Sequence, residues 1–281
     1  MQQENTCKIE KNPRYMVQFK KAPIHPQHAP AGMQAQGIRA PRIKGGITMI
    51  DVTRPELDDA ITRAWQASPE GSAAAVYTPD IERVLQGLRA NRFEAHYCAD
   101  AAEARAYLNG KIDGKKVGIG DSETLRKLEL HEALAAHNQV HNVLRSPINK
   151  GTTFFEYAKG TLLTDVFLCS VNALTEDGIL VNMDGTGNRV AAALFGHEKV
   201  YYVAGVNKIC PDLDHAIWRL RNIAAPRNCL RKHKATPCAK RGDRCYNCAS
   251  PERICNGLLI EFKKMSNMEM EVVLVGENLG L

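Results

Sequence analysis

Four closely spaced cysteines lie in the last fifth of the sequence. They follow the pattern Cys-x6-Cys-x2-Cys-x6-Cys and are Cys238, Cys245, Cys248 and Cys255. A zinc ribbon usually contributes two Cys-x2-Cys pairs, and only the central pair has that spacing here. Iron–sulfur clusters accept four thiolates at more varied spacings. The pattern favours an iron–sulfur cluster (4Fe-4S), and the alternatives are zinc or reduced or disulfide-linked thiols that bind no metal.

Basic residues surround these cysteines. Eight Lys and Arg residues lie between positions 227 and 255, against only Asp243 and Glu252. Four thiolates around a cluster leave net negative charge, which nearby cations and backbone N–H groups stabilise. The composition therefore suits a metal-binding segment at 229–256, in which Cys229 is an extra or substitute ligand. A solvated basic surface would have the same composition.

A glycine-containing turn forms a first candidate ligand site. Gly118 and Gly120 end a short apolar segment, and Ser122 and Thr124 begin an amphipathic one. Glycines permit a tight turn, and a helix N-terminus presents free N–H groups to an anion. We therefore expect these four residues to bind a phosphate or carboxylate group. The alternative is that Asp121 or Ser122 only caps the helix.

A second polar loop lies at 184–189. Gly185 and Gly187 again allow a tight turn, and Asn188 and Arg189 begin a predicted helix. The planar guanidinium group of Arg189 can orient a carboxylate or phosphate through two parallel hydrogen bonds. Polar groups between buried strands are costly unless they bind a ligand or one another. The loop therefore predicts a ligand cleft shared with the first turn, and a self-satisfied network of turns is the alternative.

Three carboxylates near the second loop are candidates for acid–base chemistry. They are Glu176, Asp177 and Asp184. A carboxylate can transfer a proton in catalysis when its surroundings adjust its pKa to the reaction. The sequence alone leaves open whether the protein is an enzyme.

The composition is that of a globular protein. Of 281 residues, 44% are hydrophobic and 24% charged, and no apolar run approaches the ~18 residues that span a bilayer. The N-terminus has no apolar signal-peptide core, so the nine cysteines are expected to be reduced or metal-bound in a cytoplasmic protein. We expect no membrane span.

The net charge of +6 comes from the N-terminal part. Residues 1–46 contain eight basic and two acidic residues, so the remainder is balanced. The stretch at 20–47 is rich in proline and lacks apolar periodicity. The sequence therefore predicts a disordered basic leader at 1–48 and one domain at 49–281. The balanced charge of the domain argues against nucleic-acid binding as its main function.

Helical and strand patterns alternate along the domain. Helices are predicted at 55–66, 79–91, 100–109, 122–136, 187–195 and 212–224, and strands at 93–98, 116–119, 141–144, 165–171, 179–182, 200–204, 258–262 and 271–275. Such alternation predicts an α/β fold with a mainly parallel sheet flanked by helices. Ligands of open α/β sheets bind at the carboxyl ends of the strands, where both polar loops are expected.

These segments resemble the LUD (lactate utilisation) domain family over roughly residues 55–281. The matching segments are VGIG at 117–120, TDVF at 164–167, NALTEDG at 172–178, VNMDG at 181–185, GNRVAA at 187–192, VAGVNKI at 203–209, RNIAAP at 221–226, and the cysteine segment from TPC at 236–238 to ICN at 254–256.

The resemblance implies a fold similar to the ribose-phosphate isomerase and CoA-transferase superfamily. It also implies a redox-associated role in bacterial oxidation of lactate to pyruvate, beside iron–sulfur oxidoreductase subunits as partners and with a small anionic metabolite as ligand. A transferase or isomerase for a phosphorylated or CoA-linked metabolite, with a structural metal, is the alternative, as is a ligand-sensing subunit.

Asn172 argues against one of these alternatives. The glycine loop is similar to that of methylthioribose-phosphate isomerases, which use an acid–base Asp where this chain has Asn172. An amide cannot shuttle a proton, so isomerisation by that mechanism is not expected.

Overall fold

The computed structural model describes residues 77–143, 153–242 and 244–281. The leader predicted at 1–48 and the helix predicted at 55–66 lie outside these ranges. Among the described residues, no helix has both the length and the apolar composition needed to cross a membrane.

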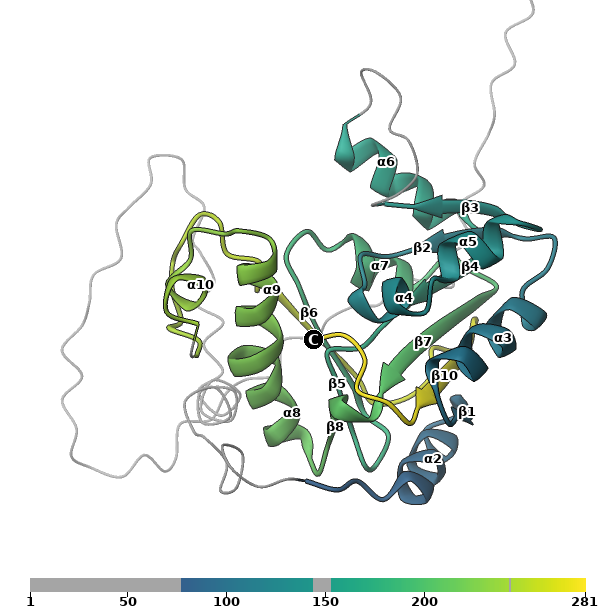
Figure 1. Ribbon diagram of the computed structural model, residues 1–281, viewed down its shortest axis with the longest axis horizontal. Helices are drawn as coiled ribbons and strands as arrows, with labels where there is room; N and C mark the ends of the chain where they lie inside the picture. The colour runs from purple at the N-terminus through teal and green to yellow at the C-terminus, as the bar shows by residue number, and fades with distance from the viewer. Residues whose placement is uncertain (1–76, 144–152, 243) are drawn as a thin grey trace, which may run out of the picture. The chain divides into compact units, whose positions relative to one another are not determined.

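A six-stranded parallel sheet forms the centre of the described fold (Figure 1). The strand order is β1-β10-β7-β4-β2-β3, and every neighbouring pair is parallel. The strands are β1 (Glu94–Cys98), β2 (Lys116–Ile119), β3 (Gln139–Asn142), β4 (Val166–Cys169), β7 (Lys199–Gly205) and β10 (Glu269–Val275). The α/β fold with a mainly parallel sheet, predicted from the alternating patterns, is confirmed.

Both faces of this sheet are buried. Along β4, Phe167 and Cys169 belong to one apolar cluster and Val166 and Leu168 to the other. The first cluster includes side chains of α2 and α7, and the second includes side chains of α3, α4 and α5. Helices on both faces explain why the strands read as nearly continuous apolar runs rather than alternating ones.

A smaller mixed sheet lies beside the large one. Its order is β8-β5-β6-β9, with β5 and β6 antiparallel, β6 and β9 antiparallel, and β5 and β8 parallel. The strands are β5 (Ala173–Thr175), β6 (Leu180–Asp184), β8 (Ile209–Cys210) and β9 (Gly257–Glu261). A third apolar cluster packs this sheet against α8 and the turn that follows it.

The helices of the described residues are short. They are α2 (Ile81–Ala90), α3 (Ala101–Lys111), α4 (Glu123–Lys127), α5 (Leu130–Ala135), α6 (Phe154–Gly160), α7 (Asn188–Leu194), α8 (Leu213–Arg219), α9 (Ala225–Arg231) and α10 (Pro237–Arg241), with 3-10 turns at Thr161–Leu163 and Val206–Lys208. Acidic or hydroxyl side chains cap most of the first turns; for example, Asp80 accepts a hydrogen bond from the N–H of Arg83 and Asp100 from that of Glu103.

The single helix predicted at 122–136 is two helices. Helix α4 ends at Lys127, and α5 begins at Leu130. Glu129 between them has a φ of 51°, in the left-handed region that no α-helix contains. Leu128 and Leu130 are both buried, so this break turns the chain while keeping its apolar side chains in the core.

The helix predicted at 212–224 extends further. A π-turn, Leu220–Ala224, joins α8 to α9 without interruption. Pro226 lies in the first turn of α9 and has no N–H to donate, so the regular α-helical bond to the carbonyl of Asn222 cannot form. A wider turn at this point accommodates the missing donor.

Candidate functional site

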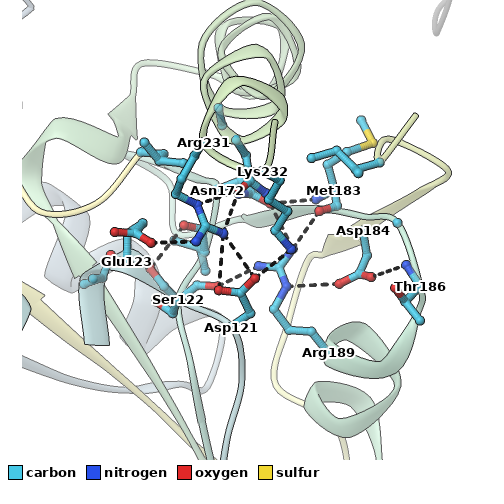
Figure 2. Close-up of a pocket in the computed structure, with 18 of the residues that line it drawn as sticks. Asp121, Ser122, Glu123, Asn172, Met183, Asp184, Thr186, Arg189, Arg231 and Lys232 are labelled. Carbon is cyan, nitrogen blue, oxygen red and sulfur yellow. Dashed lines mark hydrogen bonds and ion pairs between the residues drawn. The ribbon is translucent and has the colours of Figure 1, made fainter. Parts of the chain in front are cut away.

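A cavity of about 180 Å³ lies where strands β2, β4 and β6 end (Figure 2). The turn after β2 contributes 121–124, the turn after β4 contributes 170–172, and the end of β6 contributes 183–186. Helix α9 and the residue after it add Asn228, Arg231 and Lys232. Because β2 and β4 are adjacent parallel strands, their carboxyl ends bring these turns together.

Most of the predicted ligand residues line this cavity. They are Ser122, Thr124, Gly185, Asn188 and Arg189. The two polar loops, predicted from the sequence to share one cleft, therefore meet in the structure.

Three predicted glycines do not line the cavity and have structural reasons of their own. A Cβ atom at Gly118 would lie 2.7 Å from Thr164 Oγ1, so its place in β2 requires glycine. Gly120 packs against Phe167. Gly187 precedes α7 with a φ of 89°, which favours glycine.

Asp121 is fully paired at the rim of the cavity. Its carboxylate lies 2.7 Å from Lys232 Nζ and 3.1 Å from Arg231 Nη2. Figure 2 shows the three side chains together at the cavity. Burial alone would raise the pKa of Asp121, but hydrogen bonds and charge from Lys232 and Arg231 hold that pKa below its ordinary value. The negative charge of this turn is therefore neutralised by two cations from the end of α9.

Ser122 acts as a helix cap. Its hydroxyl oxygen accepts a hydrogen bond of 3.3 Å from the N–H of Leu125 in α4. Glu123, beside it, forms ion pairs with Arg126 and Arg231, both at 2.8 Å. The capping alternative left open by the sequence is thus present, although Ser122 also lines the cavity.

Arg189 is held by the protein through all five of its N–H groups. Nε donates to Asp184 Oδ2, Nη1 to Ser170 O and Asn182 Oδ1, and Nη2 to Asn172 Oδ1 and Met183 O, at 2.7–3.1 Å. A ligand that accepted a hydrogen bond from Arg189 would have to replace one of these bonds. In this structure Arg189 joins the ends of β4 and β6, and its direct contact with an anion stays a prediction.

Asp184 organises the second loop. Its Oδ1 accepts the N–H groups of Thr186 and Gly187, at 3.0 and 2.7 Å. Its Oδ2 pairs with Arg189 at 3.1 Å. Of the three carboxylates considered for acid–base chemistry, Asp184 is the one that lines the cavity.

Glu176 and Asp177 lie elsewhere, in the turn between β5 and β6. Glu176 is buried, pairs with Arg83 at 3.0 Å, and accepts the N–H of Asp80. Asp177 accepts the hydroxyl of Thr175. Neither residue lines the cavity. Glu176 joins α2 to the small sheet, whereas the Asp177 carboxylate bonds within its own turn.

Lys208 is a cavity residue that we did not predict from the sequence. It is only 3% exposed, and its Nζ donates to Ser170 Oγ, Thr124 Oγ1 and Val171 O at 2.8, 2.9 and 3.1 Å. Burial, and then the positive charges of Arg219 and Arg189, hold its pKa well below the ordinary value. One signal was available: Lys208 is the single charged residue between positions 200 and 211.

The cysteine segment contacts α9 and the turn before it. Arg221 of the π-turn donates to Cys245 Sγ at 3.2 Å, and Arg253 donates to Cys255 Sγ at 3.4 Å. The N–H of Asn247 also donates to Cys245 Sγ. These are the charged and backbone donors that the basic composition predicts around thiolates.

The thiols of this segment influence one another. Burial, together with the neighbouring thiols of Cys238 and Cys255, raises the pKa of Cys229 to about 11. Burial also raises the pKa of Cys255, and the thiols of Cys245 and Cys248 add to the effect. Within the described ranges, however, His, Cys, Asp and Glu side chains form no group of three or more that could hold a metal ion.

The end of the cysteine segment forms part of the cavity wall. Ile254 lines the cavity, and a Cβ atom on Gly185 would lie 3.0 Å from the Cα and carbonyl oxygen of Ile254. Asn256 donates its N–H to Asp184 O and its side-chain amide to Gly185 O, at 3.0 and 2.9 Å. The cysteine segment and the second glycine loop are therefore in direct contact.

Comparison with known proteins yields one family and one solved structure. A DUF162 family protein from Deinococcus radiodurans is similar, at 11% identity and a TM-score of 0.43 over 70% of this chain and 96% of that one. No curated protein matches the chain significantly. The family model of the LUD domain matches residues 81–275, which contain the parallel sheet, the cysteine segment and every cavity-lining residue except Leu281. The chain belongs to the LUD domain family.

Proposed function

We propose that this LUD domain protein has a redox-associated role in organic-acid metabolism of the lactate-to-pyruvate type. In this proposal the cavity binds a small anionic metabolite, and the protein acts in the cytoplasm beside iron–sulfur oxidoreductase subunits. The finer kinship with lactate utilisation protein C, suggested by the sequence motifs, is part of the proposal. The family association with lactate utilisation gives the metabolic context.

The charge of the cavity is the observation that carries the ligand class. Four cationic side chains line it, against three carboxylate side chains, and Leu281, the last residue of the sequence, lines it as well. The cations are Arg189, Lys208, Arg231 and Lys232, and the carboxylates are Asp121, Glu123 and Asp184. Its volume of about 180 Å³ is below the range of ~300–1,000 Å³ typical of drug-sized ligands. A small anion suits both properties.

We further propose that Cys238, Cys245, Cys248 and Cys255 hold an iron–sulfur cluster, with zinc as the alternative metal. The donor set is suitable because thiolates are the ligands of such clusters, and Arg221, Arg253 and the N–H of Asn247 already donate to sulfur. A bound cluster would supply one-electron transfer. The cysteines of this segment are free thiols in the structure.

Metal content of protein purified without oxygen tests the redox role. We expect iron and acid-labile sulfide with broad visible absorption, and the loss of both in Cys245→Ser. Cys98→Ser is the matched control, because Cys98 is a buried residue at the end of β1 in the large sheet, and its substitution should leave the metal content unchanged. Colourless protein that contains zinc would favour a transferase or isomerase with a structural metal. Protein with neither metal would refute the metal proposal.

A further inference from the structure

The last residues of the sequence fold back onto the cavity. Leu281 lines it beside Met183 of β6 and Asn228 of α9, and Figure 1 marks the C-terminus near these two elements. Every other lining residue belongs to the segment that the family model matches, which ends at residue 275. The tail at 279–281 is therefore a feature of the cavity that lies outside the family match.

Leu279 anchors this tail. Its side chain is 4% exposed and belongs to the second apolar cluster of the large sheet. Its N–H donates to Asn207 Oδ1 at 3.0 Å, and its carbonyl oxygen accepts a hydrogen bond of 3.4 Å from Thr124 Oγ1. Apolar packing and two hydrogen bonds thus hold the chain in place as far as residue 279.

Beyond this anchor the backbone of the tail contacts the cavity residues. Gly280 has a φ of 71°, which favours glycine. A Cβ atom at this position would clash with Thr124 Oγ1 and lie 3.2 Å from Lys208 Nζ, so a residue with a side chain does not fit here. Leu281 is only half-buried, and its carbonyl oxygen accepts a hydrogen bond of 3.3 Å from Arg219 Nη1. The last two residues are therefore held less firmly than Leu279.

Arg219 of α8 is a buried cation that faces the end of the tail. It is 6% exposed, and it donates to the backbone oxygens of Asn207, Asn172 and Leu281. Burial lowers the pKa of Arg219 to about 10, so the group stays charged at neutral pH. Within the described ranges, no carboxylate side chain pairs with it. In the 281-residue chain the terminal carboxylate of Leu281 brings a negative charge to this guanidinium group.

We propose that Gly280 and Leu281 are an internal occupant of the anion site, and that they swing out about the Leu279 anchor when a ligand binds. The inference rests on the proposed anion site and adds its regulation. A tethered group has a high effective concentration, so a free anion must compete with the tail for the cations beside it. The apparent affinity for the anion is then reduced by the fraction of molecules in which the tail has swung out.

Calorimetric titration with inorganic phosphate and L-lactate tests this proposal on the full chain and on two variants. The first variant is shortened to residue 279. The second, Gly280→Ala, keeps the length of the chain but places a Cβ atom against Thr124 Oγ1. If the tail occupies the site in about nine molecules of ten, both variants should bind the anions about tenfold more tightly. Gly110→Ala is the matched control, because nothing lies within 4 Å of its Cβ position, and its affinity should not change.

A second readout supplies the tail as a separate molecule. N-acetylglycyl-leucine has the backbone of residues 280 and 281 and a free carboxylate. It should bind the shortened chain in competition with the anion, and it should not bind the full chain. Its C-terminal amide has no charge for Arg219 and should bind at least about tenfold more weakly. Circular dichroism verifies that both variants are folded.

The outcomes separate this inference from the proposed function. Equal anion affinity in the full chain and in both folded variants would refute the internal occupant and leave the anion cleft standing. A shortened chain that does not bind the acetylated dipeptide would refute it as well. If the dipeptide binds the shortened chain but neither anion binds any of the chains, the site of the tail stands and the proposed anion cleft is wrong.

Discussion

At the scale of single residues, two cationic side chains of the cavity, Arg189 and Lys208, differ in their partners. Arg189 uses every N–H group within the protein and pairs with Asp184, whereas the buried Lys208 bonds only to uncharged oxygens among the described residues. The first arrangement stabilises the fold and the second destabilises it. A destabilising arrangement within a cavity is typical of residues retained for function.

Arg189→Ala should therefore reduce stability. The substitution leaves Asp184 without its charged partner and removes five hydrogen bonds at a side chain that is only 14% exposed. We expect the free energy of unfolding to fall by about 3 kcal/mol, as for other broken buried ion pairs. Urea denaturation measures the loss.

Arg83→Ala is the control for this prediction. Its side chain is 64% exposed although it also pairs with a carboxylate, that of Glu176. Removal of such an exposed partner usually costs about 1 kcal/mol or less. Equal losses in the two variants would contradict the structural role assigned to Arg189.

The sequence predicted several polar residues that line the cavity, but it did not predict which contacts their side chains make. Ser122, Asn188 and Arg189 were found because polar residues concentrate where strands end. The five hydrogen bonds of Arg189 could not be predicted, because they depend on how β4 and β6 lie relative to each other. Local sequence patterns do not specify that placement. Lys208 was missed because a single Lys beside a buried strand resembles a surface residue until its burial is known.

At the scale of elements, one hydrogen bond links the two sheets. Tyr202 of β7 in the large sheet donates to Glu261 Oε2 of β9 in the small sheet, at 2.7 Å. Burial raises the pKa of Glu261 to about 7, despite the opposing effects of Tyr202 and Arg189. Glu261 is 1% exposed, so the junction between the sheets contains a carboxyl group that titrates near neutral pH.

Stability should consequently decrease as the pH rises through this range. In the unfolded chain Glu261 has its ordinary pKa, 4.5, and in the folded protein it has a pKa of about 7. Between these values the folded protein binds more protons, so each increase in pH favours the unfolded state. The total effect of this group is on the order of 3 kcal/mol.

Glu261→Gln tests this pH dependence. The amide keeps an acceptor for Tyr202 but cannot ionise, so the variant should be more stable than wild type at pH 8 and similar to it near pH 5. The measurement is the urea midpoint at both pH values. If the variant is less stable than wild type at pH 8, the ionised carboxylate of Glu261 does not destabilise the folded protein.

The sequence predicted the elements of the large sheet well and their boundaries less well. Strands β7 and β10 were recognised because buried parallel strands give short continuous apolar runs. The break at Glu129 was missed, because leucines at 128 and 130 maintain an apolar pattern through the non-helical residue. The small sheet was only partly foreseen, since β5 and β8 are too short to give a periodic signal.

At the scale of the whole molecule, the cysteine segment and the cavity are joined at Gly185. The glycine faces the backbone of Ile254, which leaves no space for a side chain. Sequence spacing predicted the cysteine segment and the glycine loop separately. Their contact could not be predicted, because about 70 residues separate them in the chain and only β6 and β9 bring them together.

Gly185→Ala should disturb both regions. The new Cβ atom would lie 3.0 Å from backbone atoms of Ile254, so the segment must shift, at a cost of about 1–3 kcal/mol. We expect a lower urea midpoint and faster labelling of Cys255 by iodoacetamide in native conditions. Gly110→Ala in α3 is the control, because nothing lies within 4 Å of its Cβ position and alanine favours a helix by about 0.5–1 kcal/mol. Unchanged labelling of Cys255 in Gly185→Ala would show that the segment does not respond to this loop.

The shared wall formed by Ile254 and Asn256 has a consequence for regulation. Ile254 lines the cavity, and Asn256, two residues further on, donates a hydrogen bond to Gly185 O, so a shift of the cavity wall also involves the end of the cysteine segment. Coupling between two binding sites is reciprocal: if a ligand at one site changes the affinity of the other site by some factor, the second ligand changes the affinity of the first site by the same factor. If the cavity and the cysteines bind the metabolite and the metal proposed above, a metal at the sulfur atoms would change the affinity for the metabolite, and the metabolite would change the affinity for the metal by the same factor.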